Sequence, residues 1–313
     1  MTARRLAAAL LVAGCAHQAP PPVPGETVTL KVAYVVNPAL PGMSREQLQA
    51  VLAVARNGAR ENFGVEVEFT EPEELPLKIV FDRVTPRQRS DWSELSYDFK
   101  GGKGDRARLV RGYAAAFRSD ENSLDNQIAF AQPYLLAPVR EKTYDGFAEA
   151  VSATLVARLD QLNTQKVLDA SPANEVLYWA FIGKLSFPYD VVITNQLIAS
   201  AEYVGSSVHT AIRGGITNGI TTGNPSAPRG VTAIVSTYPV IGEDGVTRAL
   251  RGDESYSRAD GARYAGLLLV HEIGHQLFDL GHAYGKKACV MNPPGMLRFR
   301  EWAEGLSPKD CRR

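Results

Sequence analysis

A twelve-residue stretch near the carboxyl end, HEIGHQLFDLGH (271–282), holds three of the five histidines of this 313-residue chain. It continues a segment that begins near Ser257 and is rich in alanine, leucine and valine, a composition that favours a buried helix. Ser257 or Asp260 can cap the start of this helix, and Gly281 can end it. The sequence therefore predicts a long core helix that ends in a histidine-rich segment.

Two of these histidines have the spacing of paired metal ligands. His271 and His275 are four residues apart, so both lie on one face of a helix, and two imidazoles so placed can share one zinc ion at about 2.0–2.1 Å. Glu272 stands between them, where its carboxylate can hold a zinc-bound water and accept its proton. These residues predict a zinc site with a general base beside it. The alternative is a structural helix with partly exposed histidines.

A catalytic zinc needs a third protein ligand and an open fourth position. On a continuous helix, His282 lies about 20° from His271 in phase and about 10 Å beyond His275 along the axis. We therefore predict that His282 is the third ligand, that the helix runs to about Leu280, and that Gly281 turns the chain. Three carboxylates are the alternative ligands: Asp279, Glu301 and Glu304.

The segment resembles the motif of the metzincin metallopeptidases, HExxHxxGxxH followed by a methionine turn. Phe278 stands in the place of the family's glycine and Gly281 in that of its third histidine, so His282 comes one residue late. The letters CVMN (289–292) are similar to the methionine turn of the archaemetzincin branch. This resemblance implies that Met291 forms a hydrophobic floor beneath the zinc ligands.

Two cysteines lie in the part of the chain that this resemblance covers, residues 265–311. In an exported protein, Cys289 and Cys311 either form a disulfide or remain free and buried. The archaemetzincin pattern has four cysteines for a second, structural zinc, and Ala283 and Pro308 stand about where the other two would be. The resemblance therefore implies a disulfide in place of a second zinc ion.

The amino-terminal residues have the layout of an export signal. MTARRLAAALLVAGC contains two arginines, a short apolar run and the letters VAGC, which resemble a bacterial lipobox. We expect a signal peptide over residues 1–14, a lipid on Cys15 and a proline- and alanine-rich tether over residues 15–26. In similar lipoproteins, a residue such as Ala16 after the cysteine favours the outer membrane. An ordinary signal peptide or a chance match is the alternative.

Composition limits the classes of partner. Lysine plus arginine equals aspartate plus glutamate, 34 each, which gives no reason to expect nucleic acid as a partner. The sequence has no apolar run of 18 residues, so no membrane-spanning helix is predicted. We expect the membrane to be contacted only through the lipid on Cys15.

Hydrophobic patterns predict one mixed α/β (α+β) domain over residues 27–313. A helix over 44–62 separates the first two of five predicted strands, which implies a parallel pair with a crossover. Residues 83–170 read as a helical insertion with an apolar stripe on its last helix. The predicted strands are 27–36, 65–70, 78–81, 189–199 and 231–240.

The loop-rich segment IRGGITNGIT (212–221) has small residues that let a peptide backbone approach. The resemblance implies that substrate binds there as an added strand, and a plain surface loop is the alternative. Tyr284 follows the third histidine closely enough to help stabilise an oxyanion. His209 is interpreted as a loop histidine and not as a ligand.

Together, these observations predict a metzincin-like zincin domain with a mixed sheet, a long active-site helix and a helical insertion. We expect a zinc metallopeptidase with one catalytic Zn²⁺ and a peptide or protein substrate, in which Glu272 activates the zinc-bound water. The alternative is a non-catalytic, zinc-containing surface or scaffold lipoprotein. Glu272 argues against that alternative, because a structural zinc site has no use for a neighbouring free carboxylate.

Overall fold

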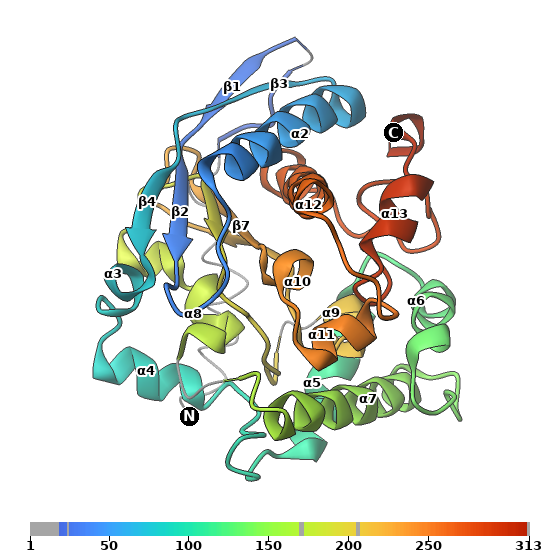
Figure 1. Cartoon of the computed structure of the whole chain (residues 1–313). Coiled ribbons are helices and arrows are strands. Elements are labelled where there is room, and N and C mark those ends of the chain that lie inside the picture. Colours follow the sequence, from blue (N-terminus) through green and yellow to red (C-terminus); the bar gives the residue numbers. More distant parts are fainter. Residues whose placement is uncertain (1–18, 24, 169–171, 205–206, 312–313) are drawn as a thin grey trace.

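The computed structural model describes residues 19–311 apart from 24, 169–171 and 205–206, and its centre is a five-stranded sheet (Figure 1). The first four strands are parallel and the last is antiparallel to its neighbour. In spatial order they are β4 (Glu73–Pro76), β2 (Val32–Val36), β5 (Val191–Thr194), β7 (Val231–Ser236) and β6 (Gly219–Gly223). The predicted mixed α/β fold is confirmed.

Side chains that alternate along the strands bury both faces of this sheet. Val32 and Tyr34 of β2 belong to one hydrophobic core, whereas Ala33 and Val35 belong to a second core on the opposite face. The first core includes the long helices α2 (Arg45–Phe63) and α12 (Arg258–Phe278). The second core includes three short helices: α3 (Leu77–Phe81), α4 (Pro86–Ser93) and α8 (Val176–Ala180).

Helix boundaries follow the side-chain caps that the sequence predicts. Ser44 and Gln47 form a reciprocal capping box at the start of α2, and Gly64 ends this helix in the left-handed conformation. Ser257 forms a capping box with Asp260 at the start of α12. The caps confirm where both long helices of the first core begin.

Four strand predictions need correction. The predicted strand 189–199 is a strand only over β5, and 231–240 is a strand only over β7, because residues 238–240 lie in a short helix. The predicted strand 27–36 is divided at Lys31 into β2 and a separate strand, β1 (Thr27–Leu30), which pairs in parallel with β3 (Glu66–Phe69). The predicted strand 78–81 is wrong, because these residues lie in helix α3 and the strand β4 precedes them. A four-residue apolar run does not distinguish a short helix from a strand, and Pro76 switches the chain from one to the other.

The predicted helical insertion forms helices; in Figure 1 α5 and α7 lie at the bottom and α6 at the lower right, away from β1 and β3. Phe147 of the apolar stripe packs against Phe117, with ring centroids 5.1 Å apart. Among the described residues, no helix combines the length and the apolarity needed to cross a membrane. Besides α4, the insertion contains α5 (Arg106–Ser119), α6 (Leu124–Ala131), η1 (Gln132–Tyr134) and α7 (Tyr144–Thr164).

The remaining elements are short and lie between the larger elements or after α12. They are η2 (Pro172–Asn174), η3 (Ile182–Leu185), α9 (Val208–Ile212), α10 (Tyr238–Ile241), α11 (Gly245–Leu250), α13 (Phe299–Gly305) and η4 (Pro308–Cys311).

Close contact between α2 and α12 depends on a glycine in the middle of α12. A β-carbon at Gly266 would lie 2.6 Å from Cβ of Val54 and 2.8 Å from the backbone oxygen of Val51, both on α2. Neither atom belongs to a flexible side-chain end, so any side chain at Gly266 forces the two helices apart.

We predict that Gly266→Ala lowers the free energy of unfolding by about 1–3 kcal/mol, although alanine is the better helix former, because the added methyl group overpacks this contact. Gly305→Ala is the control, since no atom lies within 4 Å of the β-carbon it would add in α13. Denaturant unfolding measures the free energy of unfolding of both variants. A Gly266→Ala variant that is as stable as the wild type, or more stable, would contradict the packing argument.

Candidate metal centre

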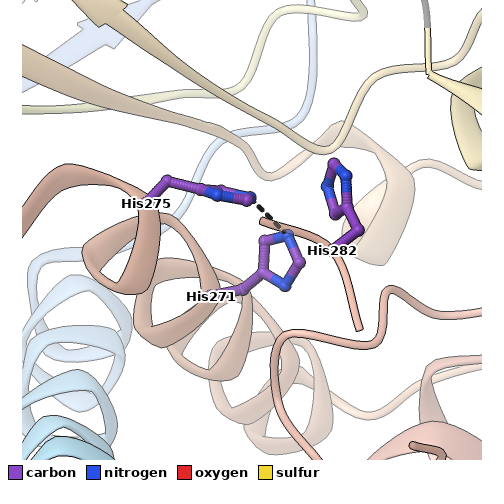
Figure 2. A group of neighbouring side chains, drawn as sticks. All are labelled: His271, His275 and His282. Carbon is purple, nitrogen blue, oxygen red and sulfur yellow. Dashed lines mark hydrogen bonds between the residues drawn. The ribbon is translucent and has the colours of Figure 1, made fainter. Parts of the chain in front are cut away.

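Three imidazole rings converge where α12 ends. His271, His275 and His282 each offer a ligand atom, and these atoms lie within 4.8 Å of one another. Figure 2 shows the three rings around one point, two from α12 and one from the loop after it. The structure thus brings together the three histidines that the sequence predicts as ligands.

Hydrogen bonds fix which ring nitrogens face the centre. Nδ1 of His271 donates to the carbonyl oxygen of Val290 at 2.8 Å, and Nδ1 of His275 donates to the carbonyl oxygen of Leu280. Because a carbonyl oxygen only accepts, both protons are on Nδ1 and each Nε2 presents a lone pair. The two Nε2 atoms lie 3.0 Å apart, an arrangement that a cation between them stabilises.

Burial keeps the three rings in the form that binds metals. It lowers the pKa of His271 to about 3 and also lowers the pKa of His275 and of His282. Neutral imidazole is the metal-binding form, so no proton has to be displaced near neutral pH. Three neutral imidazoles with converging nitrogens fit a zinc ion.

Helix α12 ends earlier than the sequence predicts. It stops at Phe278, and Asp279 adopts the left-handed conformation with a φ of 51°. The N–H groups of Asp279 and Leu280 donate to the carbonyl groups of His275 and Gly274, which closes the end of the helix. The prediction of a helix to about Leu280 is therefore wrong, because an aspartate takes the role that was expected of a glycine.

The helical insertion holds the loop that carries the third histidine. Nδ2 of Asn122, between α5 and α6, donates to the carbonyl oxygen of His282 at 2.6 Å. Phe130 of α6 packs on Tyr284, with ring centroids 4.5 Å apart. The sequence assigns no function to the insertion. The structure shows that it contacts this loop at His282 and at Tyr284 and so holds the loop in place.

The segment after this loop packs against α12 through Met291. A β-carbon at Gly274 of α12 would lie 2.3 Å from Sδ of Met291, so this glycine lets the buried methionine reach the helix. The neighbouring Val290 supplies the carbonyl group that orients His271. Cys289 and Cys311 form a disulfide that joins this segment to the carboxyl end of the described chain.

Glu272 is buried between α12 and the edge strand β6, with 5% of its surface exposed. Oγ1 of Thr221 donates to its Oε2 at 2.7 Å, and a β-carbon at Gly219 would lie 2.1 Å from its Oε1. Burial raises the pKa of Glu272 to about 8. The carboxyl group is therefore held in place by β6, and it is not one of the ligand atoms that converge in the histidine cluster.

The alternative third ligands lie outside the histidine cluster. Asp279, Glu301 and Glu304 are exposed, and none of them belongs to the group of ligand atoms found among the described residues. Asp279 lies near His275, where its charge raises the histidine's pKa against the larger effect of burial. The geometry thus favours His282 over the three carboxylates.

The interpretation of His209 as a loop histidine is wrong, because it lies in helix α9, and its ring is close to the site. Its ring centroid is 4.5 Å from that of His282, its Nδ1 is 3.0 Å from the hydroxyl group of Tyr284, and its Nε2 is 3.3 Å from Oγ of Ser207. Both ring nitrogens thus have partners, and His209 is not in the ligand group. It is 62 residues before His271, and no sequence signal links the two.

The cluster opens into a cavity of about 390 Å³. Glu272, His275 and His282 line it on one side, and Gly219, Ile220 and Thr221 of β6 line it on another. The residues of the predicted segment 212–221 thus lie partly in an edge strand beside the cluster. The described lining also includes Val176, Glu202, Ser207, His209, Thr210, Thr217 and Asp279.

No protein-family model and no curated protein matches the sequence. One solved structure that the chain resembles is that of archaemetzincin from Methanopyrus kandleri, with a TM-score of 0.32 and 13% sequence identity. The match covers 90% of this chain and 88% of that chain. A TM-score of 0.32 is too low to support an inference, so the site is interpreted from its own residues.

We predict that His282→Ala lowers zinc affinity by at least about 100-fold, whereas Asp279→Asn leaves it within about threefold. Asparagine keeps the left-handed helix end, so this control removes only the charge. Asn122→Ala should fall between them, at about tenfold, because the loop loses its anchor but keeps its ligand. Chelator competition measures all three, and a larger loss for Asp279→Asn than for His282→Ala would contradict the ligand assignment.

Proposed function

We propose that this protein is a zinc-dependent metallopeptidase with one catalytic zinc ion, in which Glu272 is the general base. The observation that carries the proposal is a buried carboxyl group, that of Glu272, in the cavity that two of the three converging imidazoles, those of His275 and His282, also line. When bound by these histidines, zinc supplies Lewis acidity and a water ligand of lowered pKa. The charge of such an ion also favours the ionised form of Glu272, opposing the effect of burial.

The position of Glu272 suits proton transfer. Thr221 fixes one carboxylate oxygen, and Gly219 leaves the other without a side chain in front of it. From this place Glu272 accepts a proton from the attacking water and donates it to the leaving amine. The peptide carbon gains one C–O bond and loses its C–N bond, so no further reactant is needed.

Strand β6 offers a place for the peptide backbone. It is the last strand of the sheet and pairs with β7 along one edge. Its residues Gly219, Ile220 and Thr221 line the cavity beside Glu272. An extended peptide added to the other edge would present a carbonyl group to the metal centre, and Gly219, which has no side chain, permits its approach.

The second candidate is a scaffold protein with a structural zinc ion. Structural sites are closed by four protein ligands, whereas the cluster found among the described residues offers three. A structural site also gains nothing from the buried carboxyl group of Glu272. Both observations favour the peptidase.

We predict that Glu272→Gln lowers kcat/KM for peptide cleavage by about 10²–10⁴-fold, because the general base is lost while the three histidines remain. Zinc content should remain equimolar, and circular dichroism should be unchanged. A mixed peptide library with mass-spectrometric detection reveals cleavage in the wild type. Glu304→Gln, on the exposed side of α13, is the control and should cleave like the wild type. Near-normal turnover by Glu272→Gln would overturn the peptidase mechanism.

We further propose that the protein is exported and lipid-anchored to the bacterial cell envelope, at the outer membrane. Residues 1–14 and Cys15 lie outside the described residues, so the proposal is supported by the sequence layout of signal, lipobox and tether.

We predict that Cys15→Ser blocks lipidation and releases the protein from the membrane fraction, because the lipid on Cys15 is the only proposed anchor. Metabolic labelling with a fatty acid and cell fractionation measure the two effects. Retention of Cys15→Ser on membranes through a high-salt wash would show that the lipobox interpretation is wrong.

A further inference from the structure

A second buried carboxyl group lines the cavity of the metal centre, and the proposed chemistry does not use it. Glu202 is 5% exposed, and Oγ of Ser200 donates to its Oε1 at 2.5 Å. The backbone around it is fixed, because the N–H of Tyr203 donates to the carbonyl of Leu95 and the N–H of Tyr97 donates to that of Ala201. Glu202 is therefore a rigid part of the cavity wall.

No cation of the protein compensates this carboxyl group within the described residues. None of the described ion pairs includes Glu202, and the described cavity lining contains Glu202, Glu272 and Asp279 but no lysine or arginine. Burial raises the pKa of Glu202 to about 8, and the nearby Glu175 adds to this effect. A buried carboxylate is costly without a counter-ion, so a cation that enters the cavity would be stabilised there.

The surroundings of Glu202 also suit a long side chain. Val176 and Thr217 line the same cavity, and Ser200 holds the carboxyl group while it accepts the N–H of Val176. An aliphatic stem can lie along such a wall while its charged end reaches the carboxylate. The cavity of about 390 Å³ has room for such a side chain in addition to the peptide backbone.

We propose that Glu202 forms a subsite for a lysine or arginine side chain, so that the protein prefers peptides with a basic residue at one fixed position from the scissile bond. This inference rests on the proposed function, because Glu202 lines the same cavity as Glu272, His275 and His282. Glu202 is a specificity-determining residue in this proposal and takes no part in proton transfer.

The test measures peptide binding without cleavage. Zinc-loaded full-length Glu272→Gln protein is titrated with short blocked peptides in which lysine or uncharged norleucine occupies each position in turn. At one position, lysine peptides should bind at least about tenfold more tightly than norleucine peptides. Adding Glu202→Gln, which can keep the bond to Ser200, should reduce this ratio to below about threefold.

Asp279→Asn is the matched control, because it removes a carboxylate of the same cavity that is exposed to solvent. It should leave the lysine-to-norleucine ratio within about twofold. If Asp279→Asn lowers the lysine-to-norleucine ratio as much as Glu202→Gln does, the subsite proposal is overturned. The preference for lysine would then come from the negative charge of the whole cavity. If Glu202→Gln does not fold, Glu202→Asp keeps the charge and should retain a preference for lysine.

The outcomes separate this inference from the proposed function. Tighter binding of lysine peptides without cleavage by the wild type would support the subsite and contradict the peptidase. Cleavage by the wild type with no preference for lysine at any position would overturn the subsite and leave the peptidase intact. Failure of every peptide to bind would overturn both.

Discussion

The placement of helix α12 on the sheet is the constraint on which the site depends. Nε2 of Gln276 donates to the carbonyl groups of Asp190 and Val231, at the beginning of β5 and β7, at 2.7 and 3.0 Å. Glu272 is one helical turn before Gln276 and therefore faces the same way, toward β6. His271 and His275 are displaced from this face by about 100°, because each precedes one of these residues by one position. One buried amide thus fixes the rotation of the helix and separates the base from the ligands.

Much of the fold and part of the site could be predicted from local sequence patterns. The alternating strands, the caps of the two long helices and the histidine spacing each depend on residues a few positions apart. His282 was predicted from helical phase, yet the structure brings it to the cluster by a different route. The helix ends at Phe278 because Asp279 adopts a left-handed conformation. Aspartate adopts this conformation only occasionally, so the sequence does not predict it.

The residues whose contacts at the site sequence analysis missed all reach it over long sequence distances. Asn122 precedes His282 by 160 residues, and Thr221 precedes Glu272 by 51. Glu202 and His209 likewise come from segments outside the histidine motif. Such contacts depend on how the insertion and the edge strand pack against α12, and no local periodicity or spacing encodes that packing. The wrong strand prediction for residues 78–81 comes from a local pattern and not from long-range contacts, since a short apolar run is compatible with a strand and with a helix.

The third ligand links the metal centre to the stability of the helical insertion. His271 and His275 belong to a buried helix, whereas His282 lies on a loop whose backbone is held by Asn122 and whose next aromatic residue packs on Phe130. A metal ion that binds all three histidines selects the conformation in which this loop is docked on the insertion. The free energy of metal binding then also stabilises the docked insertion, and a poorly packed insertion weakens metal binding by the same amount. The insertion is therefore thermodynamically part of the metal centre, although it supplies no ligand.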